Sequence, residues 1–127
     1  MKTLNIRTIG HLRDLQKNDL KLILEWRNSP KVRKNMYSQH KITIKEHLGW
    51  WETVKNSENN KYFIYEYNLE PLGFVSFSDI DLFNQTAFWA FYSSPKAPKG
   101  TGSKMEILAL NYCFSNLGIN KLCCEVL

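Results

Sequence analysis

The sequence lacks the features that define several common classes of protein. Its three cysteines, Cys113, Cys123 and Cys124, form neither a disulfide framework nor a metal-ligand spacing, and its three histidines form no zinc motif. We therefore expect reduced thiols and no bound metal. No run of residues approaches the roughly 18 apolar positions of a membrane-spanning helix, and the N-terminus has no apolar signal-peptide core. These absences predict a cytoplasmic protein without a membrane partner.

Blocks of like charge, internal repeats and low-complexity segments are also absent. The 127 residues carry a formal net charge of +5, so the surface attracts anions. Because the lysines alternate with aromatic and polar residues, we interpret this charge as attraction for a nucleotide or coenzyme, and we expect no nucleic-acid partner. A composition of 43% hydrophobic and 23% charged residues is typical of a single globular domain, 1–127.

Two helices are expected before any strand. The apolar pattern over 14–28 favours a helix, with Asn18 or Asp19 as its N-cap and Pro30 as its stop. A second helix is expected over 44–54, where Thr43 and Glu46 have the spacing of a capping box. For the tryptophans of this helix, Trp50 and Trp51, core packing is the favoured role.

Three strands are expected over 61–67, 72–80 and 86–92, where β-branched and aromatic residues form short runs between turn residues. Their connections are short, which favours antiparallel hairpins. A last strand is expected over 121–127. The chain ends at Leu127 inside this apolar run, where terminal residues usually fray in solvent, so we expect the domain to be incomplete at its C-terminus.

A long helix is expected between the third and last strands. Two apolar rows predict that it is substantially buried against the sheet, and Gly118 is a natural residue just after its end. The whole order of elements predicts an α/β (α+β) single domain. The two rows consist of Met105, Leu108, Ala109 and Tyr112, and of Ile107, Leu110, Phe114 and Leu117.

The stretch Lys99-Gly100-Thr101-Gly102-Ser103-Lys104 has the chemistry of an anion site. Its glycines allow a tight turn and a close approach of the backbone to a ligand. The free N–H groups at the start of the helix point the same way as the positive end of the helix dipole, so they favour binding of a pyrophosphate. The two lysines add positive charge. Without its context the pattern is weak, because it is neither a Walker A motif nor a dinucleotide fingerprint.

An aromatic strand, this loop and a long helix after an antiparallel meander resemble the acetyl-CoA site of the GCN5-related N-acetyltransferases (GNAT). The family's loop motif is [Q/R]xxGxG/A; Gly100 and Gly102 match it, whereas Ala97 takes the leading Gln/Arg position. Nearly the whole chain is similar to one branch of this superfamily, which acetylates a UDP-linked amino sugar in pseudaminic acid biosynthesis. The similar segments are "LKLILEWRNSPKVRKNM", "EHLGWW", "KYFIYE", "LGFVSFSDID" and "APKGTGSKM".

The resemblance implies a GNAT fold, with a mixed central sheet, a long helix after the pyrophosphate loop, and a last helix and strands that would follow residue 127. It implies acetyl-CoA as co-substrate, no metal, and acetylation of the 4-amino group of UDP-4-amino-4,6-dideoxy-N-acetyl-β-L-altrosamine for the glycosylation of flagellin or other surface proteins. In this fold the pantetheine lies between the strands that correspond to 87–92 and 122–127. It pairs there with the backbone of Phe91, Tyr92 and Ser93.

Direct acetyl transfer to an amine requires a neutral amine, a polarised thioester carbonyl and a stabilised thiolate. Glu125 is the only acidic residue of the last strand, and we predict that it accepts the amine proton through water; the alternative is a solvent-facing strand residue. Ser78 is predicted to hold that water, and its alternative is an ordinary hydrogen-bonding serine. The family's usual general acid, a tyrosine, would lie beyond the last residue of this sequence.

The predicted substrate-binding residues come from the first two helices, the segment between them and the third strand. A guanidinium forms paired hydrogen bonds with a phosphate, so we expect Arg27 to bind the UDP diphosphate; the alternative is an ion pair with Glu25 or Asp19. Soft and aromatic walls suit the sugar's 6-methyl group, whereas hydrogen bonding and stacking suit the nucleotide. The residues in these roles are Met36 and Tyr37 for the methyl group, and His47 and Trp89 for the nucleotide.

Two other functions stay open from the sequence. A ribosomal-protein N-terminal acetyltransferase of the same superfamily would share the coenzyme loop and accept a peptide, although Arg27, Met36 and Tyr37 favour the sugar. A non-enzymatic basic module would grip another phosphate, such as that of RNA, and its binding would weaken steeply with salt. A homodimer is left open as the assembly of the chain.

Overall fold

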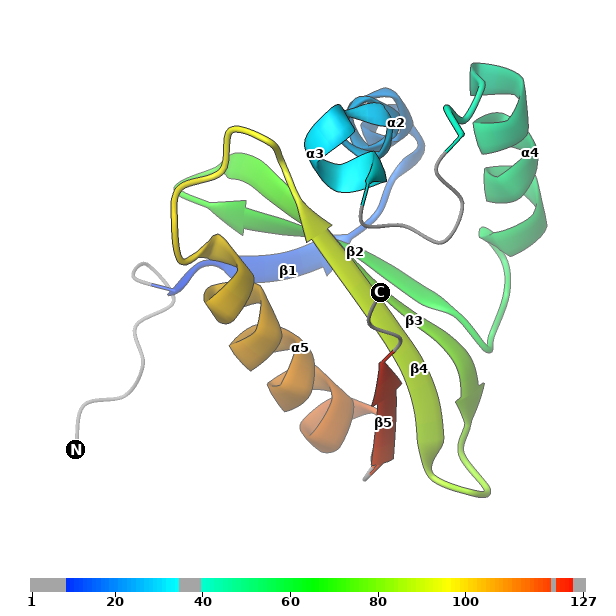
Figure 1. Ribbon diagram of the computed structural model, residues 1–127. Coiled ribbons are helices and arrows are strands. Elements are labelled where there is room, and N and C mark those ends of the chain that lie inside the picture. Colours follow the sequence, from blue (N-terminus) through cyan, green and yellow to red (C-terminus); the bar gives the residue numbers. More distant parts are fainter. Residues whose placement is uncertain (1–8, 35–39, 120, 125–127) are drawn as a thin grey trace.

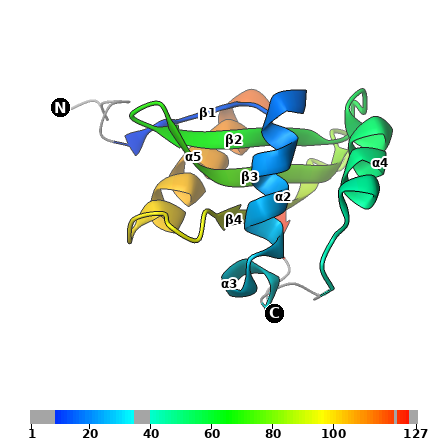
Figure 2. The same ribbon diagram turned by 90° about the horizontal axis from the view of Figure 1, so that it is seen from above.

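The fold is a five-stranded sheet with helices on both faces (Figures 1 and 2). A computed structural model describes residues 9–34 and 40–119, and the backbone of 121–124. The strands, in their spatial order, are β1 (His11–Asp14), β2 (Lys61–Tyr67), β3 (Glu70–Asp81), β4 (Thr86–Ser93) and β5 (Lys121–Cys124). The helices are α2 (Leu20–Asn28), α3 (Pro30–Arg33), α4 (Ile44–Val54) and α5 (Thr101–Asn116), with a 3-10 turn η1 at Lys17–Asp19.

The strand pairing confirms the predicted mixed sheet and its meander. β1 to β4 pair antiparallel with their neighbours, and β4 pairs parallel with β5. α4 has the predicted bounds and the predicted capping box, because Thr43 Oγ1 accepts the Glu46 N–H and Glu46 Oε1 accepts the Thr43 N–H, both at 3.1 Å. Gly118, just past the end of α5, has a φ of 65°, which confirms its expected left-handed conformation.

The predicted helix over 14–28 is wrong in its first part. Residues His11–Asp14 form strand β1 against β2, whereas α2 begins at Leu20, directly after Asp19, one of the two predicted N-cap residues. Pro30 ends α2 as expected but also begins α3, where a proline is tolerated because the first N–H of a helix has no intrahelical acceptor. Ser29 caps this short helix, since its hydroxyl accepts the Val32 N–H at 3.4 Å.

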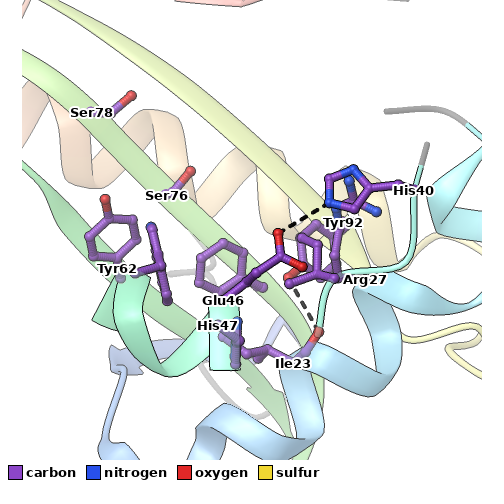
Figure 3. Close-up of a pocket in the computed structure, with 12 residues that line it drawn as sticks. Ile23, Arg27, His40, Glu46, His47, Tyr62, Ser76, Ser78 and Tyr92 are labelled. Carbon is purple, nitrogen blue, oxygen red and sulfur yellow. Dashed lines mark hydrogen bonds and ion pairs between the residues drawn. The ribbon is translucent and has the colours of Figure 1, made fainter. Parts of the chain in front are cut away.

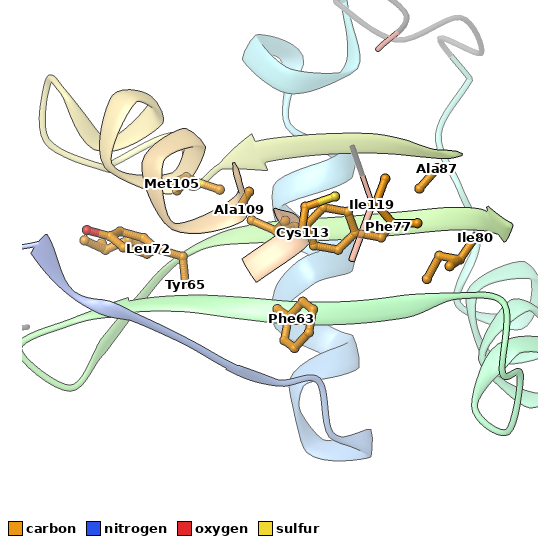
Figure 4. Packing of buried hydrophobic residues seen from close by; sticks show 11 residues of the cluster. Phe63, Tyr65, Leu72, Phe77, Ile80, Ala87, Met105, Ala109, Cys113 and Ile119 are labelled. Carbon is orange, nitrogen blue, oxygen red and sulfur yellow. The ribbon is translucent and has the colours of Figure 1, made fainter. Parts of the chain in front are cut away.

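α5 covers one face of the sheet with a single row of side chains, where two rows were predicted. Met105, Ala109 and Cys113 are fully buried against β3, four residues apart, as the helical repeat requires (Figure 4). The predicted second row is wrong at Ile107 and Phe114, which are 49% and 52% exposed. One helix on a sheet presents only one face to it, so these two residues lie on the far side.

α2 and α4 cover the opposite face. Leu20, Ile23 and Trp26 of α2 are buried in a cluster with Ile64 and Phe74 of the sheet, and the α4 tryptophans pack beside this cluster. The sheet is therefore apolar on both faces wherever a helix covers it, which explains the continuous aromatic and β-branched runs in β2 and β3.

Three charged side chains join β1 and β2 to the start of α2. Arg13 Nη1 and Nη2 donate to the two carboxylate oxygens of Asp19 at 2.8 Å each, and Arg13 Nε donates to Glu66 at 2.8 Å. The Gln16 N–H also donates to Asp19 at 2.8 Å. Both Asp19 oxygens are thus bound by Arg13, and the alternative that paired Asp19 with Arg27 is wrong.

The β2–β3 hairpin has a strained two-residue turn. Asn68 and Leu69 have φ values of 51° and 65°, and Leu69 is 86% exposed. Positive φ at both central positions favours Asn-Gly. We expect Leu69→Gly to raise the free energy of unfolding by about 1 kcal/mol, because it removes the β-carbon from the left-handed region. Chemical denaturation measures the change; Leu69→Ala removes the exposed side chain, keeps the strain, and should give no such gain.

Candidate functional site

The glycine loop ends in the first turn of α5. Gly100 has a φ of 93°, a left-handed conformation that only glycine adopts readily. The buried Thr101 closes the turn, because its N–H and its hydroxyl both donate to the Pro98 carbonyl, at 3.2 and 2.7 Å. The amides placed for a ligand are therefore those of Gly102 and Ser103, which occupy the first helical turn, where the helix itself offers no acceptor.

Gly102 has no structural reason to be glycine. Its φ is not in the left-handed region, and among the described residues a β-carbon there would meet only the Phe91 ring, at 3.9 Å. The space beside the first turn of α5 is therefore open, as close approach of a pyrophosphate requires. Lys99 is exposed at the loop, whereas Lys104 Nζ lies 4.4 Å from the centroid of the Tyr67 ring, a cation–π contact.

The edge of β4 beside this loop is open over its last residues. The parallel pairing with β5 covers Thr86 to Trp89. Within the described residues no strand pairs with this edge over Ala90–Ser93, where the predicted positions Phe91, Tyr92 and Ser93 lie. A ligand that enters here would lie along the backbone of β4 and, at one end, against the first turn of α5.

A pocket of about 450 Å³ lies on the opposite face, between α2, α4 and the strands β2 to β4 (Figure 3). The pocket arises because neighbouring rows of side chains across the sheet differ in size. In one row the large Ile64, Phe74 and Tyr92 lie side by side, whereas in the next Tyr62 is followed by the small Ser76 and Ala90. The lining residues are Ile23, Arg27, His40, Ile42, Glu46, His47, Trp50, Tyr62, Phe74, Ser76, Ser78 and Tyr92.

The structure brings together four of the predicted site residues in this pocket: Arg27, His47 and Ser78, and also Tyr92, which was predicted to pair with the coenzyme through its backbone. Trp89 lies apart from them, because it packs with Phe91, at 5.0 Å between ring centroids, beside the cluster under α5. Three further candidates, Met36, Tyr37 and Glu125, lie outside the described residues.

Several pocket residues were not predicted as site residues from the sequence. They are the aromatic Trp50, Tyr62 and Phe74, the serine Ser76, and the neighbouring His40 and Glu46. The alternation of large aromatic and small side chains along β3 and β4 is the one signal that indicates such a hollow, since period-two positions share a face. The position of the helices above that face is not encoded in any short pattern.

Two polar contacts join α2 to the pocket walls. His47 is 7% exposed, and its Nε2 lies 2.8 Å from the Leu20 carbonyl, so this nitrogen carries the proton and donates. Its ring stacks on Trp50 at 5.5 Å. The Tyr92 hydroxyl donates to the Ile23 carbonyl at 3.4 Å, and burial raises the pKa of Tyr92, which keeps the hydroxyl protonated.

His47 makes the fold sensitive to acid. Burial lowers the pKa of His47 below its ordinary value of 6.5, so the unfolded chain binds the proton first. Its contribution to stability is complete above pH 6.5 and is lost as the pH falls below that value. We expect His47→Gln, whose amide also donates, to lessen the fall in melting temperature between neutral and mildly acidic pH. His40→Gln, at an exposed histidine, should not lessen it.

No group of three or more histidine, cysteine or acidic residues among the described residues is placed to hold a metal ion. None of their helices has the length and apolar character needed to cross a bilayer.

Comparison with known proteins points to one family. A family model described as "Acetyltransferase (GNAT) domain" matches residues 11–127. A curated relative, acetyltransferase PseH of Campylobacter jejuni strain 81-176, is 26% identical over 109 residues, which span 86% of this chain and 67% of the relative. The corresponding protein of C. jejuni strain NCTC 11168 is 27% identical over the same lengths.

Solved structures share the fold. A spermidine N-acetyltransferase from Vibrio cholerae, in complex with CoA and spermine, superposes with a TM-score of 0.86 and 20% identity over 94% of this chain and 72% of its own. The C. jejuni N-acetyltransferase PseH superposes with a TM-score of 0.70 and 23% identity over 91% of this chain and 74% of its own. These identities establish the common fold and leave the acceptor open.

Proposed function

Since the chain belongs to the acetyltransferase (GNAT) domain family, and is therefore an N-acetyltransferase, we propose that its acceptor is the 4-amino group of a UDP-linked amino-dideoxy sugar. The similarity to the PseH relatives supports this acceptor. We also propose that the enzyme is cytoplasmic and acts in pseudaminic acid biosynthesis, for the glycosylation of flagellin or other surface proteins.

The observation that carries the proposal is the composition of the pocket. Arg27 and two serine hydroxyls line it, and most of the other lining residues are aromatic or aliphatic. A guanidinium suits a diphosphate, and rings with a few hydroxyls suit a sugar or a base. A polyamine such as spermine carries several positive charges and would require several carboxylates, whereas Glu46 is the one carboxylate among the described lining residues.

The residues present fit acetyl-CoA as the co-substrate. The amides of Gly102 and Ser103 and the exposed Lys99 would hold its pyrophosphate, and the open edge of β4 would pair with its pantetheine. When bound, acetyl-CoA supplies an activated acetyl thioester. A β4 backbone N–H near Tyr92 would polarise the thioester carbonyl, which lowers the barrier to attack by an amine.

The acceptor would enter from the pocket on the other face. Arg27 would hold the diphosphate, and the neutral amine would attack the acetyl carbon and lose its proton to a base. The thioester C–S bond would break, and CoA would leave as the thiolate. We retain Glu125 as the proposed base, with Ser78, which lines the pocket, holding the intervening water.

An acetyl-transfer assay tests the acceptor. The chain is incubated with acetyl-CoA and, in separate reactions, with UDP-4-amino-4,6-dideoxy-N-acetyl-β-L-altrosamine, spermine, or a peptide with a ribosomal-protein N-terminus. We expect thiol release and a mass gain of one acetyl group with the sugar alone. Turnover of spermine or of the peptide without turnover of the sugar contradicts the proposal, and binding of RNA in preference to CoA contradicts any enzymatic function.

A further inference from the structure

The mouth of the pocket holds an acidic side chain that the proposed reaction has not used. Glu46 lies on the first turn of α4, and 52% of its side chain is exposed (Figure 3). Its Oε1 accepts the Thr43 N–H at 3.1 Å, and its Oε2 lies 3.3 Å from His40 Nε2. The carboxylate is thus fixed from two sides. It keeps further acceptor sites, because an ionised carboxylate offers about four lone-pair directions.

Glu46 and Arg27 give the pocket one acidic and one basic side chain. Arg27 is supplied by α2, and Glu46 by α4. The other titratable groups that line the pocket are His40, His47, Tyr62 and Tyr92. Of these, Tyr62 and Tyr92 have raised pKa values because of burial, and His47 has a lowered pKa for the same reason, so all three are neutral at neutral pH.

We propose that Glu46 binds the acceptor's amine in its ammonium form, and that His40 positions this carboxylate. This inference rests on the proposed function and deepens it, because it makes the pocket selective for molecules that carry both an ammonium group and an anionic group. Glu46 is then a determinant of specificity for the amine.

The surroundings of Glu46 suit binding and not proton abstraction. The hydrogen bond from the Thr43 backbone, followed by those of the Thr43 and His40 side chains, holds the pKa of Glu46 below its ordinary range. A carboxylate of low basicity stays ionised and attracts a cation, but it is a poor proton acceptor near neutral pH. The amine would therefore be captured at Glu46 and lose its proton to another group.

The experiment uses Glu46→Gln. Glutamine serves the third position of a capping box as well as glutamate does, so the variant removes the charge and keeps the helix start. Glu52→Gln is the matched control, because it makes the same charge change on α4 at a residue that pairs with Lys55, at 2.7 Å, and does not line the pocket. Kinetics with the UDP-linked amino sugar are measured at neutral pH and above the pKa of its amine.

We expect Glu46→Gln to raise the KM for the amino sugar about fivefold at neutral pH, the upper end for a partly exposed charge pair, with kcat unchanged. The ratio of the KM of Glu46→Gln to the KM of the native chain should fall toward one as the amine loses its charge at high pH. His40→Ala should raise KM in the same direction by less, and Glu52→Gln should leave it unchanged. An unchanged KM in Glu46→Gln, or a loss confined to kcat, overturns the inference.

Calorimetric binding separates this inference from the proposed function. The amino sugar and its 4-hydroxyl counterpart are titrated into the native chain and into Glu46→Gln, without acetyl-CoA. A loss of affinity for the amine alone in Glu46→Gln supports an ammonium site even if no acetyl transfer occurs. An equal loss for the hydroxyl compound, equal affinities throughout, or no binding by the native chain overturns it, and the transfer assay then decides the proposed function separately.

Discussion

Gly102→Asp is expected to lower the affinity for acetyl-CoA by about 100-fold while the protein stays folded. The change places a negative charge on the first turn of α5, beside the amides proposed to hold the pyrophosphate. Loss of charge-assisted hydrogen bonds of 1.5–3 kcal/mol corresponds to roughly this factor. In the part of the chain that the structure describes, a β-carbon at this position meets only the Phe91 ring, at 3.9 Å, which is an ordinary contact distance, so we expect the variant to fold. Isothermal titration with CoA measures the loss.

The same substitution should not lower the stability of the fold. An acidic residue in the first turn of a helix interacts favourably with the helix dipole, so the melting temperature should stay the same or rise. Asn111→Asp, at an exposed position in the middle of the same helix, adds the same charge and should leave CoA affinity unchanged. If Gly102→Asp binds CoA as the native chain does, the pyrophosphate lies elsewhere.

Local patterns predicted the elements whose signals are short-range. The capping box at Thr43 and Glu46 joins residues three apart, and α4 begins and ends where this signal and its apolar spacing indicate. The hairpins of β2, β3 and β4 depend on turns of a few residues, and their pairing was predicted as well. The glycine loop could be placed before a long helix, although it lies partly within the first turn of that helix and not ahead of it.

The features that were missed depend on contacts between distant residues. β1 has only four residues, and its strand character comes from pairing with β2, about fifty residues later. The predicted burial of Ile107 and Phe114 failed because an apolar row does not reveal which face of a helix meets the sheet. The pocket required the large and small side chains of three strands to be compared across the sheet, and the helices α2 and α4 to be placed above them.

The hydrogen bonds of Arg13 with Asp19 and Glu66, here called the Arg13 network, also join distant parts of the chain. Disrupting this network is expected to cause the largest loss of stability. Arg13→Met leaves the carboxylate of Asp19, which is 10% exposed, without its cation. It also removes the guanidinium from Glu66, which is 14% exposed and keeps His11 Nε2 at 3.3 Å. Breaking a buried ion pair on one side costs 3–5 kcal/mol, and the 30% exposure of Arg13 favours the lower value. We expect the free energy of unfolding to fall by about 3 kcal/mol in chemical denaturation.

Acid provides an independent check on this network. The hydrogen bonds from Arg13 hold the pKa of Asp19 below its ordinary value of 3.8, so the contribution of Asp19 is complete above that pH and is lost as the pH falls through the lowered value. Arg13→Met should abolish this part of the acid sensitivity, and Arg13→Met with Asp19→Asn should be more stable than Arg13→Met alone, because no carboxylate is then left unpaired at that position. Lys55→Met, which breaks an exposed pair with Glu52, should have no measurable effect. Equal losses in Arg13→Met and Lys55→Met would mean that the network does not fix α2, the helix that carries Arg27 to the pocket.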